Sequence, residues 1–341
     1  MVREVDTGIE KRQVSELTPG LKSQTIDIDE IPIIDFTPMH ETDLSAQKQL
    51  ASAVYRACTE IGFFYVKNHG VAQIVIDAVQ NSSQSFFLQP VDQKKRIDIS
   101  HSSFNRGYIP LYGEKNNSRS KGDIKETFDM AIEIDVDDPD YLAGNPLYGP
   151  NQWPESLPSF RDDMEAYFGE MTKFSHMLYR VFAQALDLPA DYFLNDVDKP
   201  LDILRLLRYP TQNVVSNESQ IGTGAHSDFD CFTILWQDPN GGLQALNREG
   251  VWINAPPVDG TMLINVGDMM ERWTNGKFVS TVHRVINRSG RERYSMVFFV
   301  APNYSTRIEC IPSCYVTGMP SKYRPISAGD YIVTRYNEVI V

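Results

Sequence analysis

The sequence predicts an α+β fold that is mainly β in its core: a double-stranded β-helix, or jelly-roll barrel, flanked by helices. Two observations carry this prediction. Before residue 200 the apolar residues recur three and four positions apart, the period of a helix that packs on one side. After residue 200 they form short runs separated by turn residues. Many short strands at close spacing are typical of a sandwich or a barrel, and helices from the first half would cover one of its faces.

The first half begins with a polar segment and then alternates strands and helices. Residues 1–25 show no clear period, so we expect a mobile tail or an arm packed on the surface. The apolar run 31–36 predicts a short buried strand, and 63–66 predicts a second one. Helical spacing predicts helices over 44–61, which Gly62 ends, and over 72–88.

A long stretch without periodicity separates these elements from the clearest helix of the chain. Residues 100–158 are rich in loop-forming side chains and prolines, and such a long irregular stretch is usually a functional loop. Within it, 105–129 combines loop residues with charged and aromatic ones, so we expect a mobile lid beside the functional site. The following apolar stripe, 164–185, predicts a helix packed on a sheet.

The second half predicts seven strands. Turn signals at 240–242 and 248–250 separate some of them. The predicted strands are Ile203–Tyr209, Phe232–Trp236, Gly242–Leu246, Gly250–Ile253, Met262–Val266, Val279–Ile286 and Tyr294–Val300.

We therefore expect one catalytic unit with four parts. They are a tail over 1–25, a mostly helical region over 26–200, the jelly-roll core over 201–310, and a C-terminal segment over 311–341.

Composition excludes several classes of function. The chain has 341 residues with 42% hydrophobic and 23% charged side chains, which is ordinary for a globular protein. Its net charge of −13 disfavours nucleic acid as a substrate and favours a small organic molecule. Four cysteines are too few and too scattered for a disulfide framework, and no apolar run approaches about 18 residues. We therefore expect a cytoplasmic protein with no membrane partner; the oligomeric state is left open.

Two histidines and one aspartate carry the strongest chemical signal. His226 and Asp228 are one residue apart, so in an extended segment both face the same side. His283 lies 55 residues after Asp228 in a strand-like run, and strands distant in sequence lie side by side in a jelly roll. Two imidazoles and a carboxylate leave one side of a metal open, the arrangement of a non-haem Fe(II) oxygenase. The other histidines (His40, His69, His101 and His176) have no partner at ligand spacing, and Cys310 with Cys314 lacks the second pair of a metal site.

Ten residues after His283, an arginine and a serine predict a seat for a carboxylate. Arg293 and Ser295 point to the same side of a strand that continues into the buried run 297–300. An inward arginine on a buried strand needs an acidic partner, and its planar fork binds a carboxylate through two hydrogen bonds. We therefore expect an organic acid to bind next to the metal.

These motifs together resemble the isopenicillin N synthase-like branch of the Fe(II)/2-oxoglutarate-dependent dioxygenases. The resemblance extends from 31–36 to Tyr304. It rests on Gly224-Ala225-His226-Ser227-Asp228, Gly241-Gly242-Leu243-Gln244, Asn265-Val266-Gly267-Asp268, His283-Arg284-Val285 and Arg293-Tyr294-Ser295. It implies that His226, Asp228 and His283 bind Fe(II), and that Arg293, Ser295 and Tyr209 bind the far carboxylate of 2-oxoglutarate.

The implied function is an oxygenase that couples oxidative decarboxylation of 2-oxoglutarate to oxidation of a small organic substrate. The oxidation would be a hydroxylation, a desaturation or a cyclisation, with O2 as the oxidant and ascorbate as a supporting reductant. The resemblance does not identify the prime substrate.

Four alternatives stay open. Leu207 stands where many plant members carry asparagine, and Arg208-Tyr209-Pro210 is the form found in isopenicillin N synthase. That enzyme is an oxidase that uses no 2-oxoglutarate and seats its substrate on the same arginine and serine. An ethylene-forming 2-oxoglutarate oxygenase is a second alternative, and a zinc hydrolase is a third. The fourth is a jelly-roll binding protein with a structural metal, although such sites normally have a fourth protein ligand.

Overall fold

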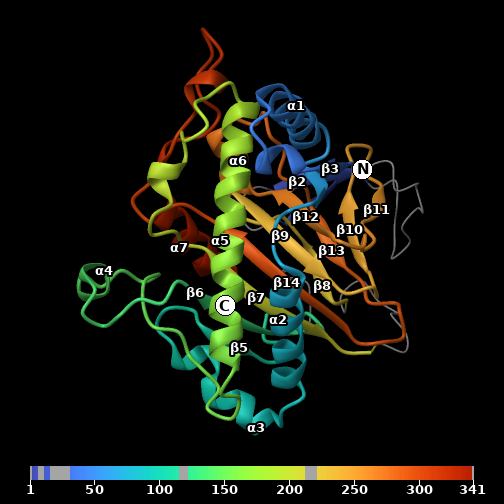
Figure 1. The fold of residues 1–341 in the computed structure, drawn as a ribbon, viewed down its shortest axis with the longest axis vertical. Coiled ribbons are helices and arrows are strands. Elements are labelled where there is room, and N and C mark those ends of the chain that lie inside the picture. Colours follow the sequence, from blue (N-terminus) through green and yellow to red (C-terminus); the bar gives the residue numbers. More distant parts are fainter. Residues whose placement is uncertain (1, 7–10, 16–30, 115–121, 212–220, 340–341) are drawn as a thin grey trace.

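The computed structural model describes residues 2–6, 11–15, 31–114, 122–211 and 221–339. Two sheets face each other, and helices cover the outer face of the larger one (Figure 1). The large sheet has eight strands and the small one has four. This is the jelly-roll core with flanking helices that the sequence predicts.

The large sheet joins strands from both halves of the chain. Its order is β3 (Ile33–Asp35), β4 (Phe63–Lys67), β12 (Thr261–Val266), β9 (Phe232–Gln237), β14 (Arg293–Val300), β7 (Ile203–Tyr209), β6 (Glu126–Ala131) and β5 (Gly107–Ile109). Every neighbouring pair is antiparallel except β3 with β4. The division that we propose at residue 200 therefore separates stretches of sequence but does not cut the sheet.

The small sheet has the order β11 (Trp252–Asn254), β10 (Leu243–Leu246), β13 (His283–Val285) and β8 (Thr223–His226). Two further strand pairs lie outside these sheets: β1 (Val2–Asp6) with β2 (Lys11–Ser15), and β15 (Arg307–Ile308) with β16 (Ile326–Ser327).

Three long helices supply most of the cover. They are α1 (Leu44–Glu60), α2 (Gln73–Phe87) and α5 (Phe160–Ala185), and α5 crosses the whole large sheet (Figure 1). The Asp43 carboxylate caps the start of α1 by accepting from the backbone of Ser45 and Ala46. Gly62 ends α1 with φ +73°, and a Cβ there would lie 2.1 Å from the carbonyl oxygen of Val279, so only glycine fits.

The remaining helices are short or lie at the end of the chain. They are α3 (Val91–Lys94), α4 (Pro139–Leu142), α6 (Asp268–Trp273) and α7 (Ala328–Val339). Single 3-10 turns occupy Thr37–His40, Lys95–Ile97, Ile99–His101, Leu194–Asp196 and Pro312–Cys314. No helix within the described ranges has both the length and the apolar character needed to cross a membrane.

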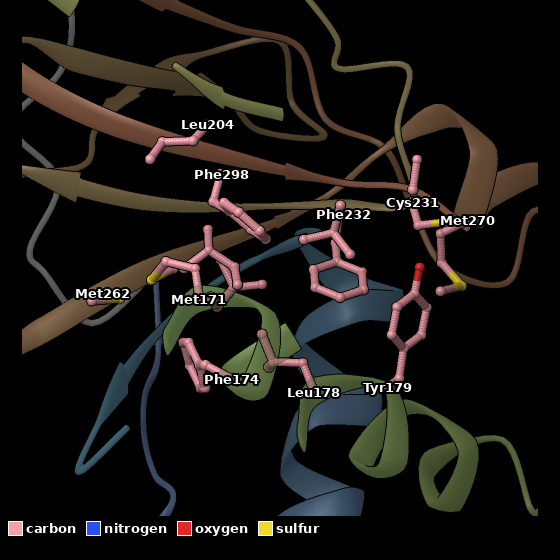
Figure 2. Close-up of a cluster of buried hydrophobic side chains, with 14 of the residues drawn as sticks. Met171, Phe174, Leu178, Tyr179, Leu204, Cys231, Phe232, Met262, Met270 and Phe298 are labelled. Atoms are coloured by element: carbon pink, nitrogen blue, oxygen red, sulfur yellow. The ribbon is translucent and has the colours of Figure 1, made fainter. Parts of the chain in front are cut away.

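Side chains of the large sheet point alternately toward the helices and toward the small sheet, so the buried residues form two groups. On β14, Phe298 and its alternate neighbours pack against the helices, while Arg293 and Ser295 face the space between the sheets. Figure 2 shows the helix side, where Phe232 and Phe298 meet Met171 and other side chains of α5. The smaller apolar group between the sheets combines Phe63 and Tyr65 of β4 with residues of the small sheet.

The predicted strands of the second half and the three long helices are present, with small shifts of their ends. One expectation was wrong: the stretch 100–158 is not irregular throughout, because it contains β5 and β6. The first 25 residues include the paired strands β1 and β2, and the segment 311–341 includes α7, elements that were not predicted from the sequence. The strand β8 was also missed.

Candidate metal centre

The structure brings His226, Asp228 and His283 together at one end of the small sheet. His226 ends β8, His283 begins β13, and the two residues are direct partners across this antiparallel pair. Their rings lie 4.3 Å apart between centroids. The Oδ1 atom of Asp228 lies 3.5 Å from the Nε2 atom of each histidine. Within the described ranges, these three residues form the one group of histidine, cysteine and acidic side chains with metal-ligand spacing.

Hydrogen bonds orient both imidazoles toward a shared point. The Nδ1 atom of His226 bonds the carbonyl oxygen of Gly224 at 2.8 Å, and the Nδ1 atom of His283 bonds that of Thr281 at 3.1 Å. A carbonyl only accepts, so each Nδ1 carries the hydrogen and each Nε2 keeps its lone pair for a metal. Such supporting bonds are the usual accompaniment of metal-binding histidines.

The Asp228 carboxylate is held in a matching way. Its Oδ2 atom accepts from Thr233 Oγ1 at 2.5 Å and from Asn265 Nδ2 at 2.8 Å. This leaves Oδ1 facing the two Nε2 atoms. The three ligand atoms therefore fit a single cation bound on one face.

Electrostatics favours the metal-ready protonation states. Burial opposes ionisation of Asp228, but the nearby His283 and His226 and the bond from Thr233 hold its pKa well below the usual range. Burial lowers the pKa of His283 to about 4, so its imidazole is neutral at pH 7. A carboxylate and a neutral imidazole are the forms that bind a divalent cation.

A tight turn fixes the loop that carries Asp228. The backbone N–H groups of Gly267 and Asp268 donate to the carbonyl oxygens of Cys231 and Asp228. A Cβ on Gly267 would lie 2.0 Å from the carbonyl oxygen of Asp230, so this close approach requires glycine. The turn explains two of the positions in Asn265-Val266-Gly267-Asp268, a motif to which the sequence assigned no role.

The predicted carboxylate seat lies on the strand pair β14–β7, facing the space between the sheets. Arg293 is opposite Tyr209 in the register, and its guanidinium carbon lies 4.8 Å from the centre of the tyrosine ring. Its Nη1 donates to Ser295 Oγ at 3.1 Å. The Tyr209 hydroxyl lies 3.1 Å from Thr223 Oγ1 on β8, the strand that ends at His226. The three predicted residues therefore share one site next to the histidine strand.

Arg293 has the contacts expected of an anion-binding arginine. It is 1% exposed, and no carboxylate in the described part of the chain forms an ion pair with it. Its Nε has no hydrogen-bond partner. Its Nη2 donates to Gln237 Oε1 at 3.1 Å, which orients the fork without neutralising the charge. A buried cation of this kind is costly unless an anion binds it.

Gln237, Asn265 and Thr233 form hydrogen bonds with the predicted site residues, and the sequence did not reveal these contacts. They lie on β9 and β12, and no fixed spacing links them to the residues that they support. Asn265 belonged to a motif, which was the one available signal.

The remaining histidines lie outside the metal group, as expected. His40 and His101 bond backbone carbonyl oxygens at 2.9 Å and 3.3 Å, and His69 accepts from the backbone of Val71. Cys310 and Cys314 are free thiols and belong to no metal group in the described ranges. A pocket of about 470 Å³ lies between β3 and α1, and none of the predicted site residues lines it.

The expected lid borders the centre but differs in structure from the expectation. Asp123 Oδ1 accepts from the backbone N–H of Gly224, two residues before His226. The described part of 105–129 includes the hairpin β5–β6 of the large sheet, with mostly buried side chains, so a wholly irregular loop was the wrong expectation. Residues 115–121 lie outside the described residues, and the mobility of the segment stays a prediction.

Comparisons with known proteins agree with this geometry. The family described as non-haem dioxygenase in morphine synthesis N-terminal matches residues 31–156, and the 2OG-Fe(II) oxygenase superfamily matches residues 201–302. The chain is 35% identical over 312 residues to the 2-oxoglutarate-Fe(II) type oxidoreductase hxnY of Emericella nidulans, covering 90% of this chain and 89% of that protein. It is 33% identical over 324 residues to a homoarginine-6-hydroxylase of Oryza sativa, covering 91% and 97%.

A solved structure shows the same arrangement of the chain. The full-length T7H of Neurospora crassa in complex with alpha-KG superposes with a TM-score of 0.82 at 31% identity, covering 93% of this chain and 99% of that one. The same protein has also been solved with alpha-KG and thymine.

Proposed function

Because this chain belongs to the 2OG-Fe(II) oxygenase superfamily, we propose that His226, Asp228 and His283 are its iron ligands. The family establishes the reaction class: a non-haem Fe(II) dioxygenase that couples oxidative decarboxylation of 2-oxoglutarate to oxidation of a small organic substrate. Fe(II), 2-oxoglutarate and O2 supply the oxidation, and 2-oxoglutarate leaves as succinate and CO2. The proposal assigns residues of this chain to that reaction.

One observation carries the assignment of the ligands. Every polar side-chain atom of the three residues that points away from the shared centre has its own hydrogen bond, while Nε2, Nε2 and Oδ1 face one another. A structural zinc site would need a fourth protein ligand, and the described part of the chain offers none at ligand distance.

We assign Arg293, Ser295 and Tyr209 to the distal carboxylate of 2-oxoglutarate. The support is the buried Arg293 guanidinium, which has hydrogen-bonding capacity left and no described carboxylate partner. Ser295 and Tyr209 place two hydroxyls beside it. Their role is to hold the far end of the cosubstrate, so that its keto acid end reaches the metal.

Three alternatives lose support. An oxidase of the isopenicillin N synthase type uses no 2-oxoglutarate, whereas hxnY is named for 2-oxoglutarate and the T7H structure was solved with alpha-KG. A zinc hydrolase or a metal-containing binding protein leaves the Arg293 seat without a ligand. The prime substrate and its position in the site determine which oxidation occurs: hydroxylation, desaturation, cyclisation or ethylene formation.

The proposal is tested by aerobic incubation with Fe(II), ascorbate and 2-oxoglutarate, followed by assay of succinate. We expect slow succinate release without a prime substrate, and loss of this release in His226→Ala and His283→Ala. Iron content per folded chain is measured in parallel. Oxygen uptake that proceeds equally without 2-oxoglutarate would establish the oxidase instead.

We further propose a cytoplasmic location, supported by four free cysteines. Fluorescence microscopy of a tagged chain in its own cells would test this proposal. Accumulation in a secretory compartment or at a membrane would refute it.

A further inference from the structure

Solvent reaches the inner face of the large sheet beyond the carboxylate seat. On β14, Val297 and Phe299 are partly accessible, whereas the alternate residues that face the helices are buried. On β7, Arg205 is partly accessible and lies directly opposite Val297. Arg205 is four residues from Tyr209 on one strand, which places it about 13 Å farther along the sheet. This region is adjacent to the proposed 2-oxoglutarate seat but is not part of it.

Five charged residues form an interior charge cluster there: Glu114, Asp123, Lys125, Asp129 and Arg205. Arg205 donates from Nε and Nη2 to the two oxygens of Asp129 at 2.7 and 2.5 Å, and its Nη2 lies 3.0 Å from Glu114. Lys125 Nζ lies 3.0 Å from Glu114 and 3.5 Å from Asp123. Asp123 accepts from the backbone N–H of Gly224 on the strand of His226, so the cluster borders the metal centre.

Within this cluster, the accessible members are one cation and one anion. The side chains of Arg205 and Glu114 are 17% and 20% exposed, while those of Lys125 and Asp129 are 4% exposed. Arg205 and Glu114 are also bonded to each other, because Arg205 Nη1 donates to Glu114 Oε2 at 3.3 Å. The contacts with Asp129, Lys125 and each other hold both side chains in place and leave one N–H on Arg205 Nη1 and one lone pair on Glu114 Oε1 for a molecule that enters.

Aromatic side chains lie beside this pair. The Arg205 guanidinium carbon lies 5.7 Å from the centre of the Phe299 ring. Phe229, the residue after Asp228, meets Tyr336 of α7 edge-on at 5.5 Å between centroids. Burial raises the pKa of the Tyr336 hydroxyl, and the charge of Asp230 raises it further. Such rings give a small organic molecule apolar surfaces to pack against.

We propose that Arg205 and Glu114 recognise the prime substrate, a small molecule of no net charge that has a hydrogen-bond acceptor for Arg205 and a donor for Glu114. The inference rests on the proposed function of the metal centre and names the substrate class for that site. Uncharged amides and zwitterions both fit this description.

The alternating charges set the preference for a neutral molecule. A net anion would gain from Arg205 but would lie beside Glu114, and a net cation would gain from Glu114 but would lie beside Arg205. Like charges in a partly dry interior repel strongly because water screens them little. A molecule with one donor and one acceptor group satisfies both accessible residues without an unpaired charge.

Arg208 is a control that distinguishes substrate recognition by Arg205 from a purely structural role of its ion pairs. Arg208 lies on the same strand as Arg205, faces the helices, and is 19% exposed. It also bonds two carboxylates, those of Glu126 and Glu292. If Arg205 only stabilised the fold, Arg205→Gln and Arg208→Gln would have similar consequences.

The test uses the full-length protein and pairs of probes that differ in charge: nicotinamide with nicotinate, glutamine with glutamate, and thymine with orotate. Two readouts are taken: stimulation of succinate release above the rate without probe, and the probe-induced shift in Tm of the protein loaded with Mn(II) and 2-oxoglutarate. We expect a neutral member of at least one pair to act more strongly than its anionic counterpart in both assays. Arg205→Gln and Glu114→Gln should raise the concentration of that probe for half-maximal effect about 10- to 100-fold, while the rate without probe stays measurable.

The control variant Arg208→Gln should leave the probe concentration unchanged. If Arg205→Gln does not fold, as judged by circular dichroism, Arg205→Lys replaces it, because lysine keeps the charge but loses the planar fork. The inference is overturned if anionic probes act best, if no neutral probe acts in either assay, or if the Arg205 and Glu114 variants match Arg208→Gln. A wild-type protein that releases no succinate from 2-oxoglutarate would instead count against the proposed function, and the Tm assay would still decide this inference.

Discussion

The two faces of the large sheet come from the same strands but have opposite chemistry. On the helix side, alternate residues of β14 and β9 are large and apolar, and Figure 2 shows how closely they pack on α5. On the inner side, the same strands present Arg293, Ser295 and Gln237. Side chains of a strand point to its two faces alternately, so the same strands can stabilise the fold on one face and form the proposed site on the other. Substitutions on the two faces should therefore affect different measurements.

The largest expected effect is on the inner side. His283→Ala removes one of three proposed ligands and should abolish iron binding and succinate formation, while far-UV circular dichroism stays close to that of the wild type. Metal content is measured by elemental analysis of the purified variant. Iron bound at a full equivalent would show that His283 is not a ligand.

The helix side should give the reverse result. Phe298→Ala removes a fully buried ring that packs on Phe168 of α5. We expect a loss of about 3–5 kcal/mol in the free energy of unfolding, measured with urea. Iron bound per folded chain should stay near the wild-type value. Weakened iron binding in the chains that remain folded would break the proposed separation of the two faces.

Arg293→Ala sharpens the comparison within the inner side. Loss of a charged hydrogen bond costs about 1.5–3 kcal/mol, so the apparent affinity for 2-oxoglutarate should fall roughly 10- to 150-fold. Iron binding in the absence of 2-oxoglutarate should be unchanged, because Arg293 does not contact the three ligands. Equal 2-oxoglutarate requirements in variant and wild type would remove Arg293 from the seat.

A further prediction is a pH dependence that leaves the metal centre unchanged, and it concerns a buried carboxylate with no basic partner among its described contacts. Burial raises the pKa of Asp202 to about 8, and its Oδ1 accepts from the backbone N–H of Ala301. Because the folded protein holds this proton more tightly than the unfolded chain, the protonated Asp202 carboxyl contributes fully to the free energy of unfolding below the unfolded pKa near 4. This contribution is lost as the pH rises toward the folded-state pKa of about 8. The loss is at most about 1.4 kcal/mol per pH unit.

Asp202→Asn should remove this pH dependence, because asparagine keeps the acceptor and has no proton to lose. The free energy of unfolding of both proteins is measured with urea at pH 5, 6, 7 and 8. The free energy of unfolding of the variant, relative to that of the wild type, should increase with pH. A constant difference between the two proteins would show that Asp202 does not titrate in this range.

The sequence predicted strands with an apolar face but missed a strand whose buried residues include charged ones. The pairs His226 with Asp228 and Arg293 with Ser295 were predicted because one short extended segment fixes each spacing, whereas His283 was added from its strand-like context and the family resemblance. The strand β6 was missed because Lys125 just before it and Glu126 and Asp129 within it are charged and resemble a loop, although all three are buried. The rule that strands have one apolar face fails where the inner face is built from ion pairs.

The supporting residues of the centre could not be predicted for a different reason. Asn265 reaches Asp228 from 37 residues away, and Gln237 reaches Arg293 from 56 residues away. These contacts exist only because β12, β9 and β14 are neighbours in the sheet. No local pattern in the chain encodes such an order, so only the three-dimensional structure reveals these residues.

The pairing of β4 with β12 has a consequence for how the protein is made. Tyr65 lies opposite Leu263, a residue that the ribosome adds nearly 200 positions later. Until β12 is synthesised, one edge of β4 has no partner in the sheet, and unpaired strand edges invite association between chains. Contacts this distant in sequence also slow folding. The first half of the chain should therefore depend on chaperones during translation, and its release as a separate fragment should yield aggregates.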